Sequence, residues 1–416
     1  MFDNALFLLQ IAVIVGFSRL VAAAFRRFGQ PQVVGEMAAG IALGPTLFGL
    51  LFPGAYHALF PPASLGFLNA LSQIGLTIFM FLVGVRVDFT ELRNQRGVAI
   101  VTSNVSVIVP LVMGIALAQY LYPRYGNGSH AAFALFIGTA MSVTAFPVLA
   151  RILMERNLLG THLGSVAIAC AAVDDITAWI LLSAIVALTT HDRNARPLWL
   201  MFVYIAVYLV IMLILGRILD AWSKRVDERK LPLHAMVIFV VLALVSGAAG
   251  EWIGIHSLVG AFVAGLVTPR KFRQQLIDKL EAVTLLLLIP LFFALTGIRT
   301  NLVFTLGAGA YLDLLLILLV AVASKWGGTM IGARAKGMGW RDACQLGLMM
   351  NTRGLVELIV LNVGLDRGIL SPVLFSMMVC MALVTTLMAT PLMDWFGGTK
   401  LTAVADKSES AHRIVV

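Results

Sequence analysis

The sequence predicts an all-α polytopic membrane protein with about thirteen transmembrane helices. Of its 416 residues, 60% are hydrophobic and only 12% are charged, and the mean hydropathy is +0.94. Soluble domains are about half apolar and about a quarter charged. Apolar runs of roughly twenty residues, the length of a membrane-crossing helix, recur along the whole chain. Composition and run length together therefore exclude a soluble globular fold.

The first apolar run has no basic segment before it and no small-residue cleavage site after it, so we interpret it as a helix rather than a secretory signal. The ninth run is short, and the fifth and twelfth contain polar interruptions. The predicted spans are 4–25, 32–51, 65–86, 98–122, 131–154, 161–189, 197–221, 232–250, 254–268, 282–298, 305–333, 341–365 and 372–396.

The distribution of basic residues predicts the orientation of these spans. With the N-terminus outside, most lysines and arginines fall in internal connections, and the external ones hold only Arg124, Arg193, Arg196, Arg299 and Arg367. This bias predicts an external N-terminus and an internal C-terminus. The net charge of +9 is then explained by topology and by contact with anionic lipid, and no nucleic-acid partner is expected.

The chain divides into a membrane domain, 1–398, and a cytoplasmic tail, 399–416. Three cysteines (Cys170, Cys344 and Cys380) fall inside spans, at a spacing that suggests neither a disulfide framework nor a metal site. No cofactor is expected.

Two adjacent acids, Asp174 and Asp175, lie in the long apolar run 161–189. A charge at the centre of a membrane helix costs about 2.5–3.5 kcal/mol on insertion scales, and such residues usually mark an ion or proton pathway. Helix geometry turns neighbouring side chains about 100° apart, so two different roles are expected. A structural ion-pair cluster is the alternative interpretation.

Lys325 is the lysine deepest within a span. A lysine at that depth needs a carboxylate to stabilise its charge, and Asp174 is the predicted partner; snorkelling to the interface is the alternative. Arg19 is expected to snorkel, and Glu36 to lie at an interface or a helix start.

The fifth span is predicted to break at Ser142 and Thr144, because Pro147 removes one backbone donor and clashes with the preceding turn. Irregular backbone at membrane depth is tolerated where it lines a cavity or is buried in protein. A simple proline kink is the alternative.

The twelfth span is predicted to break across residues 351–354, which include Asn351 and Thr352. Arg353 and Glu357 lie four residues apart and can pair on one helix face or neutralise the half-helix ends; this structural role is favoured over direct ion binding. The two breaks lie seven spans apart, so their helices run antiparallel. This predicts inverted repeats over about 32–189 and 254–396.

The segments "GEMAAGIALGP", "SVTAFPVLARIL", "VDDITAW", "GAFVAGLV", "PLFFALTGI" and "NTRGLVELIVLN" resemble the monovalent cation:proton antiporters, in particular the second branch with Kef-type and plant cation/H+ exchangers. The resemblance covers essentially the whole chain. It implies a homodimer with two crossed broken helices, and an elevator-type motion of a core (about 98–189 and 305–396) against a scaffold (mainly 4–86 and 197–298). It also implies a multi-pass plasma membrane (bacterial inner membrane) location.

The resemblance implies that Asp175 carries the cation and the proton, that Lys325 pairs with Asp174, and that Thr144 is the polar residue of the first break. Members with an Asp–Asp pair are usually electrogenic. Kef-type systems carry a C-terminal nucleotide-binding domain that this chain lacks, so gating on the same polypeptide is not expected, while a separate regulatory subunit stays open.

We therefore expect an antiporter, not an enzyme, that exchanges Na+, or else K+ or Li+, for protons at Asp175, Asp174, Thr144 and Ser142. Three alternatives remain at this stage, and one of them is a channel or a receptor without transport activity; a channel would give large, uncoupled currents. An organic-anion carrier of the same fold would use Arg353, but two acids at the site argue against it. An intramembrane aspartyl protease needs carboxylates from two separate helices, whereas these two are chain neighbours.

Overall fold

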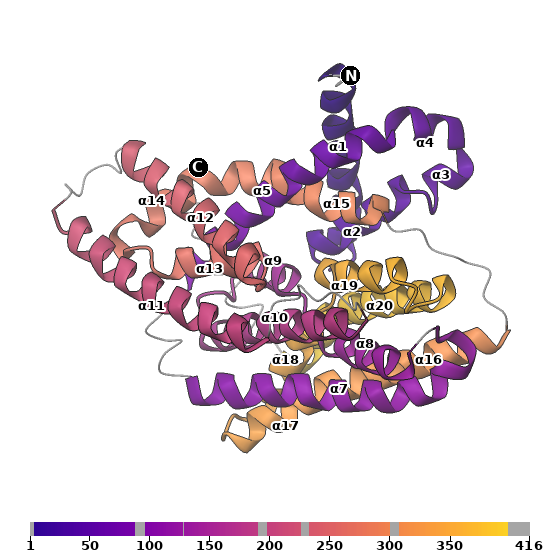
Figure 1. The fold of residues 1–416 in the computed structure, drawn as a ribbon. Helices are drawn as coiled ribbons and strands as arrows, with labels where there is room; N and C mark the ends of the chain where they lie inside the picture. Colours follow the sequence, from indigo (N-terminus) through magenta and orange to yellow (C-terminus); the bar gives the residue numbers. More distant parts are fainter. Residues whose placement is uncertain are drawn as a thin grey trace. The chain divides into compact units, whose positions relative to one another are not determined.

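The computed structural model describes residues 4–87, 96–127, 129–189, 198–225, 233–299 and 308–397, so the predicted tail 399–416 lies outside the described residues. Its elements are almost all α-helical, with two short π-helical segments named η1 and η2 (Figure 1). Within the described ranges, eleven helical segments are long and apolar enough to cross a membrane. The chain is therefore a multi-pass membrane protein, as predicted.

Two predicted spans have no counterpart among those eleven. The span 254–268 corresponds to α13 (Ser257–Leu266), which is short, and 341–365 corresponds to α18 (Trp340–Met350) and α19 (Leu355–Asp366), which are separate helices. The count of thirteen stays a prediction. The helical segment that corresponds to the tenth predicted span, 282–298, begins earlier, at Arg270, because α14 (Arg270–Val283) continues into it without interruption.

The chain divides into two compact units. The first comprises the described residues of Met1–Val21, Glu36–Phe89 and Trp179–Asn301, and the second those of Ala22–Gly35, Thr90–Ala178 and Leu302–Val416. Three of the dividing points fall inside helices, namely α1 (Asn4–Arg27), α2 (Gln32–Leu43) and α10 (His162–Thr189), and the other two lie outside the described residues.

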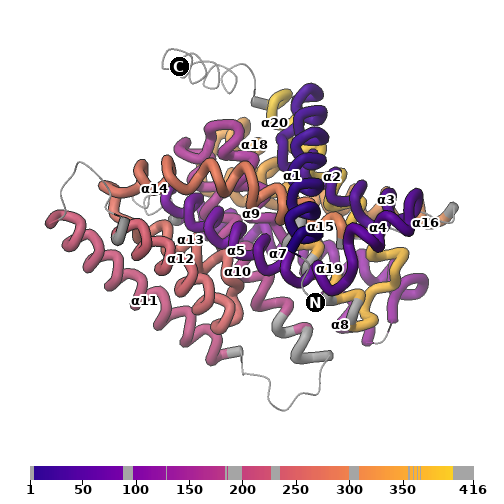
Figure 2. Tube along the Cα trace, turned by 90° about the horizontal axis from the view of Figure 1, so that it is seen from above, coloured from indigo at the N-terminus to yellow at the C-terminus, as the bar shows by residue number. Residues whose placement is uncertain are grey.

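In the first unit, α13 packs against α5 (Pro62–Arg86) and α12 (Leu233–Ile253), and α15 (Ile289–Arg299) also packs against α5 (Figure 2). Two glycines permit the close approach of α13 to α5: a Cβ on Gly84 would lie 2.1 Å from the Phe262 carbonyl oxygen, and one on Gly265 would lie 2.1 Å from that of Phe81. Small residues at such positions bring helix backbones together in membranes. The elements of this unit not yet given are α3 (Phe48–Leu51), α4 (Pro53–Leu59), α11 (Leu198–Ser223) and η1 (Thr284–Leu288).

An ion pair in this unit corrects two expectations. Glu36 is fully buried rather than interfacial, and its Oε1 lies 3.7 Å from Nη1 of Arg19. Arg19 also donates to the carbonyl oxygen of Leu285. Arg19 therefore does not simply snorkel to the membrane surface, because it is held to a buried acid in the same unit.

The second unit contains both predicted breaks. Here α7 lies against α8, α16 and α17, while α20 packs against α16, α18 and α19 (Figure 1). The elements of this unit not yet given are α7 (Arg96–Tyr125), α8 (His130–Ser142), α9 (Phe146–Glu155), α16 (Ala308–Val322), η2 (Ala323–Gly327), α17 (Gly328–Ala335) and α20 (Pro372–Gly397).

Candidate ion-binding site

The fifth predicted span breaks where the sequence indicates. The helix α8 ends at Ser142, Val143 is extended (φ −66°, ψ 136°), and α9 begins at Phe146 with Pro147 in its first turn. Proline is tolerated at a helix start, where its missing N–H has no intrahelical partner. Pro147 therefore marks the start of a new helix rather than a kink within one.

The twelfth predicted span also breaks, between Met350 and Leu355, and this break contacts the first one. The backbone N–H of Ala145 donates to the carbonyl of Thr352 at 3.0 Å, and Thr144 Oγ1 donates to the carbonyl of Met350 at 3.0 Å. These bonds satisfy backbone groups that would otherwise be unpaired at membrane depth. Two segments about two hundred residues apart in sequence thus form one junction.

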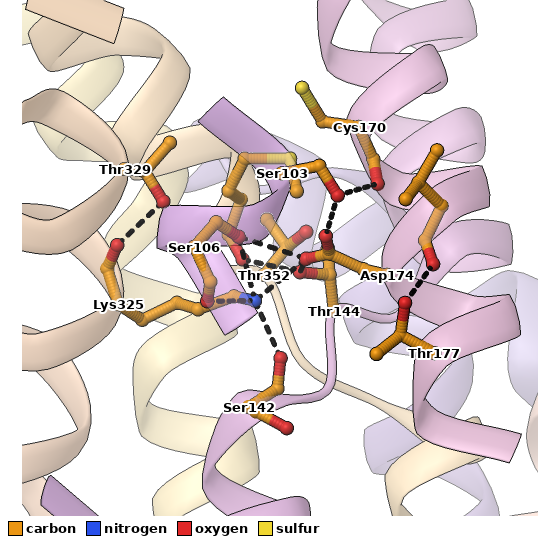
Figure 3. Close-up of polar contacts among 12 residues, drawn as sticks. Ser103, Ser106, Ser142, Thr144, Cys170, Asp174, Thr177, Lys325, Thr329 and Thr352 are labelled. Atoms are coloured by element: carbon orange, nitrogen blue, oxygen red, sulfur yellow. Dashed lines mark hydrogen bonds and ion pairs between the residues drawn. The ribbon is translucent and has the colours of Figure 1, made fainter. Parts of the chain in front are cut away.

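Asp174 lies beside this junction as a fully paired carboxylate (Figure 3). Its Oδ1 accepts a hydrogen bond from Ser103 Oγ at 2.7 Å. Its Oδ2 has three donors, Ser106 Oγ at 2.9 Å, Thr144 Oγ1 at 2.9 Å and Lys325 Nζ at 2.8 Å. Hydrogen bonds from hydroxyls and an ammonium stabilise the ionised form of a carboxylate.

Lys325 is held as tightly as its partner acid. It lies in the π-helical segment η2 (Ala323–Gly327), a local geometry often found at functional sites. Besides Asp174, its Nζ donates to the carbonyl of Ser142 at 2.6 Å and contacts the carbonyl and hydroxyl oxygens of Ser106, each at 3.0 Å. The predicted contact between Lys325 and Asp174 is therefore present, and snorkelling is not, because Lys325 is completely buried.

Asp175, the next residue, has the opposite surroundings. Its side chain is completely buried, yet neither carboxylate oxygen has a hydrogen-bond partner among the residues that the structure describes. Buried polar groups in proteins are nearly always paired, and a buried carboxylate without partners is costly. A group of this kind is suited to bind something absent from the bare chain, either a proton or a cation.

Arg353 and Glu357 form a second buried pair within one helix turn. Arg353 Nη1 lies 3.4 Å from Glu357 Oε1, as the spacing predicts. The guanidinium also reaches α8, donating to the carbonyls of Ala140 at 3.0 Å and Met141 at 2.7 Å. Lys325 donates to the carbonyl of Ser142, which ends α8. Two cationic side chains therefore bond to the last carbonyls of α8, where the helix dipole places a partial negative charge.

Thr144 and Ser142, which are predicted to lie at the site with the two acids, contact Asp174 and Lys325. The Thr144 hydroxyl donates to Asp174. Ser142 contributes its carbonyl rather than its hydroxyl, which bonds within α8 to Thr139. The 100° separation of neighbouring helix residues predicts two roles but cannot assign a neighbour to each carboxylate.

The other residues of the second break differ from each other. Thr352 bonds through its hydroxyl to the carbonyl of Met349 at 2.7 Å and through its own carbonyl to Ala145. Asn351 is completely buried, and within the described part of the chain neither its amide nitrogen nor its amide oxygen has a hydrogen-bond partner.

Sequence reasoning misses three polar residues of this unit. Ser103 and Ser106 hold Asp174, but serines are common in membrane helices and carry no charge signal. Asp313 is buried and accepts from Arg124 at 3.0 Å and from Tyr125 at 2.7 Å. Its charge within the predicted span 305–333 was a signal that could have been used.

Within the described residues, no group of three or more His, Cys, Asp or Glu side chains could hold a metal ion. The arrangement instead offers one unpaired carboxylate, backbone carbonyls and hydroxyl groups. Hard monovalent cations prefer oxygen ligands of this kind.

Comparisons with known proteins agree with this chemistry. The family model described as "Sodium/hydrogen exchanger, transmembrane" matches residues 12–396. The chain belongs to this exchanger family. The result confirms the resemblance to monovalent cation:proton antiporters that the sequence motifs indicate.

Relatives in this family come from bacteria, plants and fungi. The chain is 42% identical to the Na(+)/H(+) antiporter NhaS4 of Synechocystis sp. over 396 residues, 93% of this chain and 96% of that protein. It is 38% identical to the cation/H(+) antiporter 15 of Arabidopsis thaliana and 33% identical to the K(+)/H(+) antiporter 1 of Saccharomyces cerevisiae. The alignments span 94% and 93% of this chain but only 48% and 46% of the two eukaryotic proteins.

The fold is similar to a solved structure, that of the sodium proton antiporter MjNhaP1 from Methanocaldococcus jannaschii. The TM-score is 0.68 with 13% sequence identity, over 95% of this chain and 98% of the other. This likeness shows the fold. The family's own name and that of its relatives give no support to an anion carrier or a protease.

Proposed function

We propose that the protein is a secondary antiporter that exchanges a monovalent cation for protons by alternating access. The observation that carries the proposal is the contrast between two adjacent acids: Asp174 has four hydrogen-bond donors, and Asp175, equally buried, has none. Only Asp175 is left able to exchange its occupant.

Competition for the Asp175 carboxylate provides the coupling. A carboxylate at membrane depth holds either a proton or a cation, since protonation removes the charge that attracts the cation. Alternate occupancy from the two sides of the membrane then exchanges the two ions. Asp174 keeps Lys325 in place through their ion pair. When Asp175 exchanges a proton for a cation, the strength of the Asp174–Lys325 interaction changes.

Na+ is the favoured cation, with K+ or Li+ as alternatives, because relatives include proteins named as Na(+)/H(+) and K(+)/H(+) antiporters. An ionised Asp174 beside the exchanging carboxylate favours electrogenic exchange. We further propose a homodimer with the N-terminus outside and the C-terminus in the cytoplasm, in a plasma or bacterial inner membrane rich in anionic lipid. A separate regulatory subunit remains compatible with this proposal.

The second unit contains the acids and both breaks, so we propose that it is the moving core and that the first unit is the scaffold. The inverted repeats, about 32–189 and 254–396, place one break in each half.

The test uses purified protein in proteoliposomes with an acid interior and a ΔpH-sensitive dye. Addition of Na+, K+ or Li+, but not choline, should dissipate the gradient, and Asp175→Asn should abolish the response. Lowering the external pH, on the side where the cation is added, should raise the apparent KM for the cation by up to about tenfold per pH unit for one competing proton. Full exchange by a folded Asp175→Asn protein would refute the proposal.

A further inference from the structure

Asn351 combines complete burial with an unpaired side chain. Neither the nitrogen nor the oxygen of its amide has a hydrogen-bond partner among the described residues, whereas its neighbour Thr352 is paired. Leaving a buried amide unpaired costs folding free energy, because the group loses its hydrogen bonds to water without replacing them. Such a cost is expected where the group binds a ligand that the bare chain does not contain.

The position of Asn351 places it at the junction of the breaks. The residues on both sides of it bond to the first break, Met350 to Thr144 and Thr352 to Ala145. Thr144 also bonds to Asp174, whose chain neighbour is Asp175. Asn351 and Asp175 are therefore each the chain neighbour of a residue in the same hydrogen-bond network, Thr352 and Asp174 respectively; Figure 3 shows these two neighbours.

The helix end that Asn351 follows is electrostatically suited to a cation. Asn351 caps α18. The carbonyl of Met349 accepts from the backbone N–H of Asn351 and from Thr352, and that of Met350 accepts from Thr144, so all these donors are uncharged. The C-terminal end of a helix carries a partial negative charge. At α8 two fixed cations offset that charge, and at α18 a transported cation would do so.

We propose that Asn351 is a ligand of the transported cation and, with Asp175, determines which alkali ion is preferred. This inference rests on the proposed function. The amide oxygen would coordinate the ion, and the amide nitrogen would donate to a water that the ion retains. A neutral amide binds a cation but is not protonated in this pH range, so Asn351 acts on cation affinity and leaves proton binding to Asp175.

The experiment measures KM for Na+, K+ and Li+ in proteoliposomes at several pH values. Asn351→Ala should raise KM for the preferred cation about tenfold or more, since one ligand to a charged group is lost, and should change the ratio of the three KM values. The pH dependence of exchange at saturating cation should not move. Asn362→Ala is the matched control, because the Asn362 amide nitrogen already bonds within α19 to Leu358 at 2.8 Å.

A purely structural role for Asn351 would give a less stable protein with unchanged KM values, and that result overturns the inference. If Asn351→Ala does not fold, Asn351→Asp decides, since it keeps the shape: the added carboxylate should lower the cation KM and steepen the pH dependence, and wild-type values of both would overturn the inference. Absence of exchange from the wild-type protein with any alkali cation would instead refute the proposed function.

Discussion

The two helix breaks share a layout but differ in charge. At the first, the carbonyls of Ala140, Met141 and Ser142 accept from the charged groups of Arg353 and Lys325. At the second, the carbonyls of Met349 and Met350 accept from neutral hydroxyl and amide groups. Among the described residues, cationic side chains therefore bond to the helix end at the first break and not to the helix end at the second. We infer from this difference that the partial negative charge is offset permanently at the first break and is free to attract a transported cation at the second.

The largest expected effect comes from removing the guanidinium at the first break. Arg353→Met leaves Glu357 without its cation and the carbonyls of Ala140 and Met141 without donors, all in a fully buried place. Breaking a buried ion pair in this way costs about 3–5 kcal/mol. Thermal unfolding in detergent should show the lowest midpoint of the variants discussed. An unfolding midpoint equal to that of wild type would show that the positive charge at the first break does not stabilise the protein.

Removing the other cation should have a smaller effect on stability. Lys325→Met takes one donor from Asp174 and one from the Ser142 carbonyl, but Asp174 keeps the hydroxyls of Ser103, Ser106 and Thr144. We expect a lower unfolding midpoint, less reduced than for Arg353→Met, and a changed charge per exchange cycle measured as current across a planar membrane. Wild-type stability and wild-type charge movement together would remove the role assigned to Lys325.

Thr144→Val tests the junction with little change of shape. It removes the hydroxyl that contacts both Asp174 and the Met350 carbonyl, at an expected cost of about 1–3 kcal/mol. Thr177→Val on α10 is the matched control, because Thr177 bonds only to the Val173 carbonyl of its own helix, at 2.8 Å. Equal unfolding midpoints for the two variants would argue against coupling of the breaks through Thr144.

The smallest effects are expected for the serines of α7. Ser103→Ala and Ser106→Ala each remove one donor from Asp174, at about 1–2 kcal/mol. Each variant should therefore unfold in detergent at a midpoint a little below that of wild type. Ser324→Ala, next to Lys325 but bonded to the Ala321 carbonyl, is the matched control and should change the midpoint less. Equal midpoints for all three variants would contradict the account.

Charge is the feature that makes the fold and part of the site predictable from sequence. The membrane class, both breaks and the partnership of Lys325 with Asp174 follow because an unpaired charge or an open backbone is costly at membrane depth. The sequence does not predict which of the two acids bonds to Thr144. The side chains of neighbouring helix residues point in different directions, and the local sequence does not say which of them faces the first break.

Neutral partners and local backbone irregularities were not predictable in the same way. Ser103 and Ser106 carry no charge that singles them out in an apolar helix, and their role depends on α7 lying beside α10. The π-helical turn at Lys325 also has no sequence signal in the run "ASKWG". The contacts of Arg353 with α8 join residues more than two hundred positions apart, which a pattern within one helix cannot reveal.

The central claim is that the two adjacent acids have divided roles, Asp174 fixed by its donors and Asp175 exchangeable. The most direct measurement compares Asp174→Asn and Asp175→Asn in proteoliposomes, recording cation-driven dissipation of ΔpH and its dependence on an imposed membrane potential. We predict that Asp175→Asn abolishes exchange, whereas Asp174→Asn retains exchange with altered dependence on the potential. Retention of exchange by folded Asp175→Asn, with loss only in Asp174→Asn, would contradict the account.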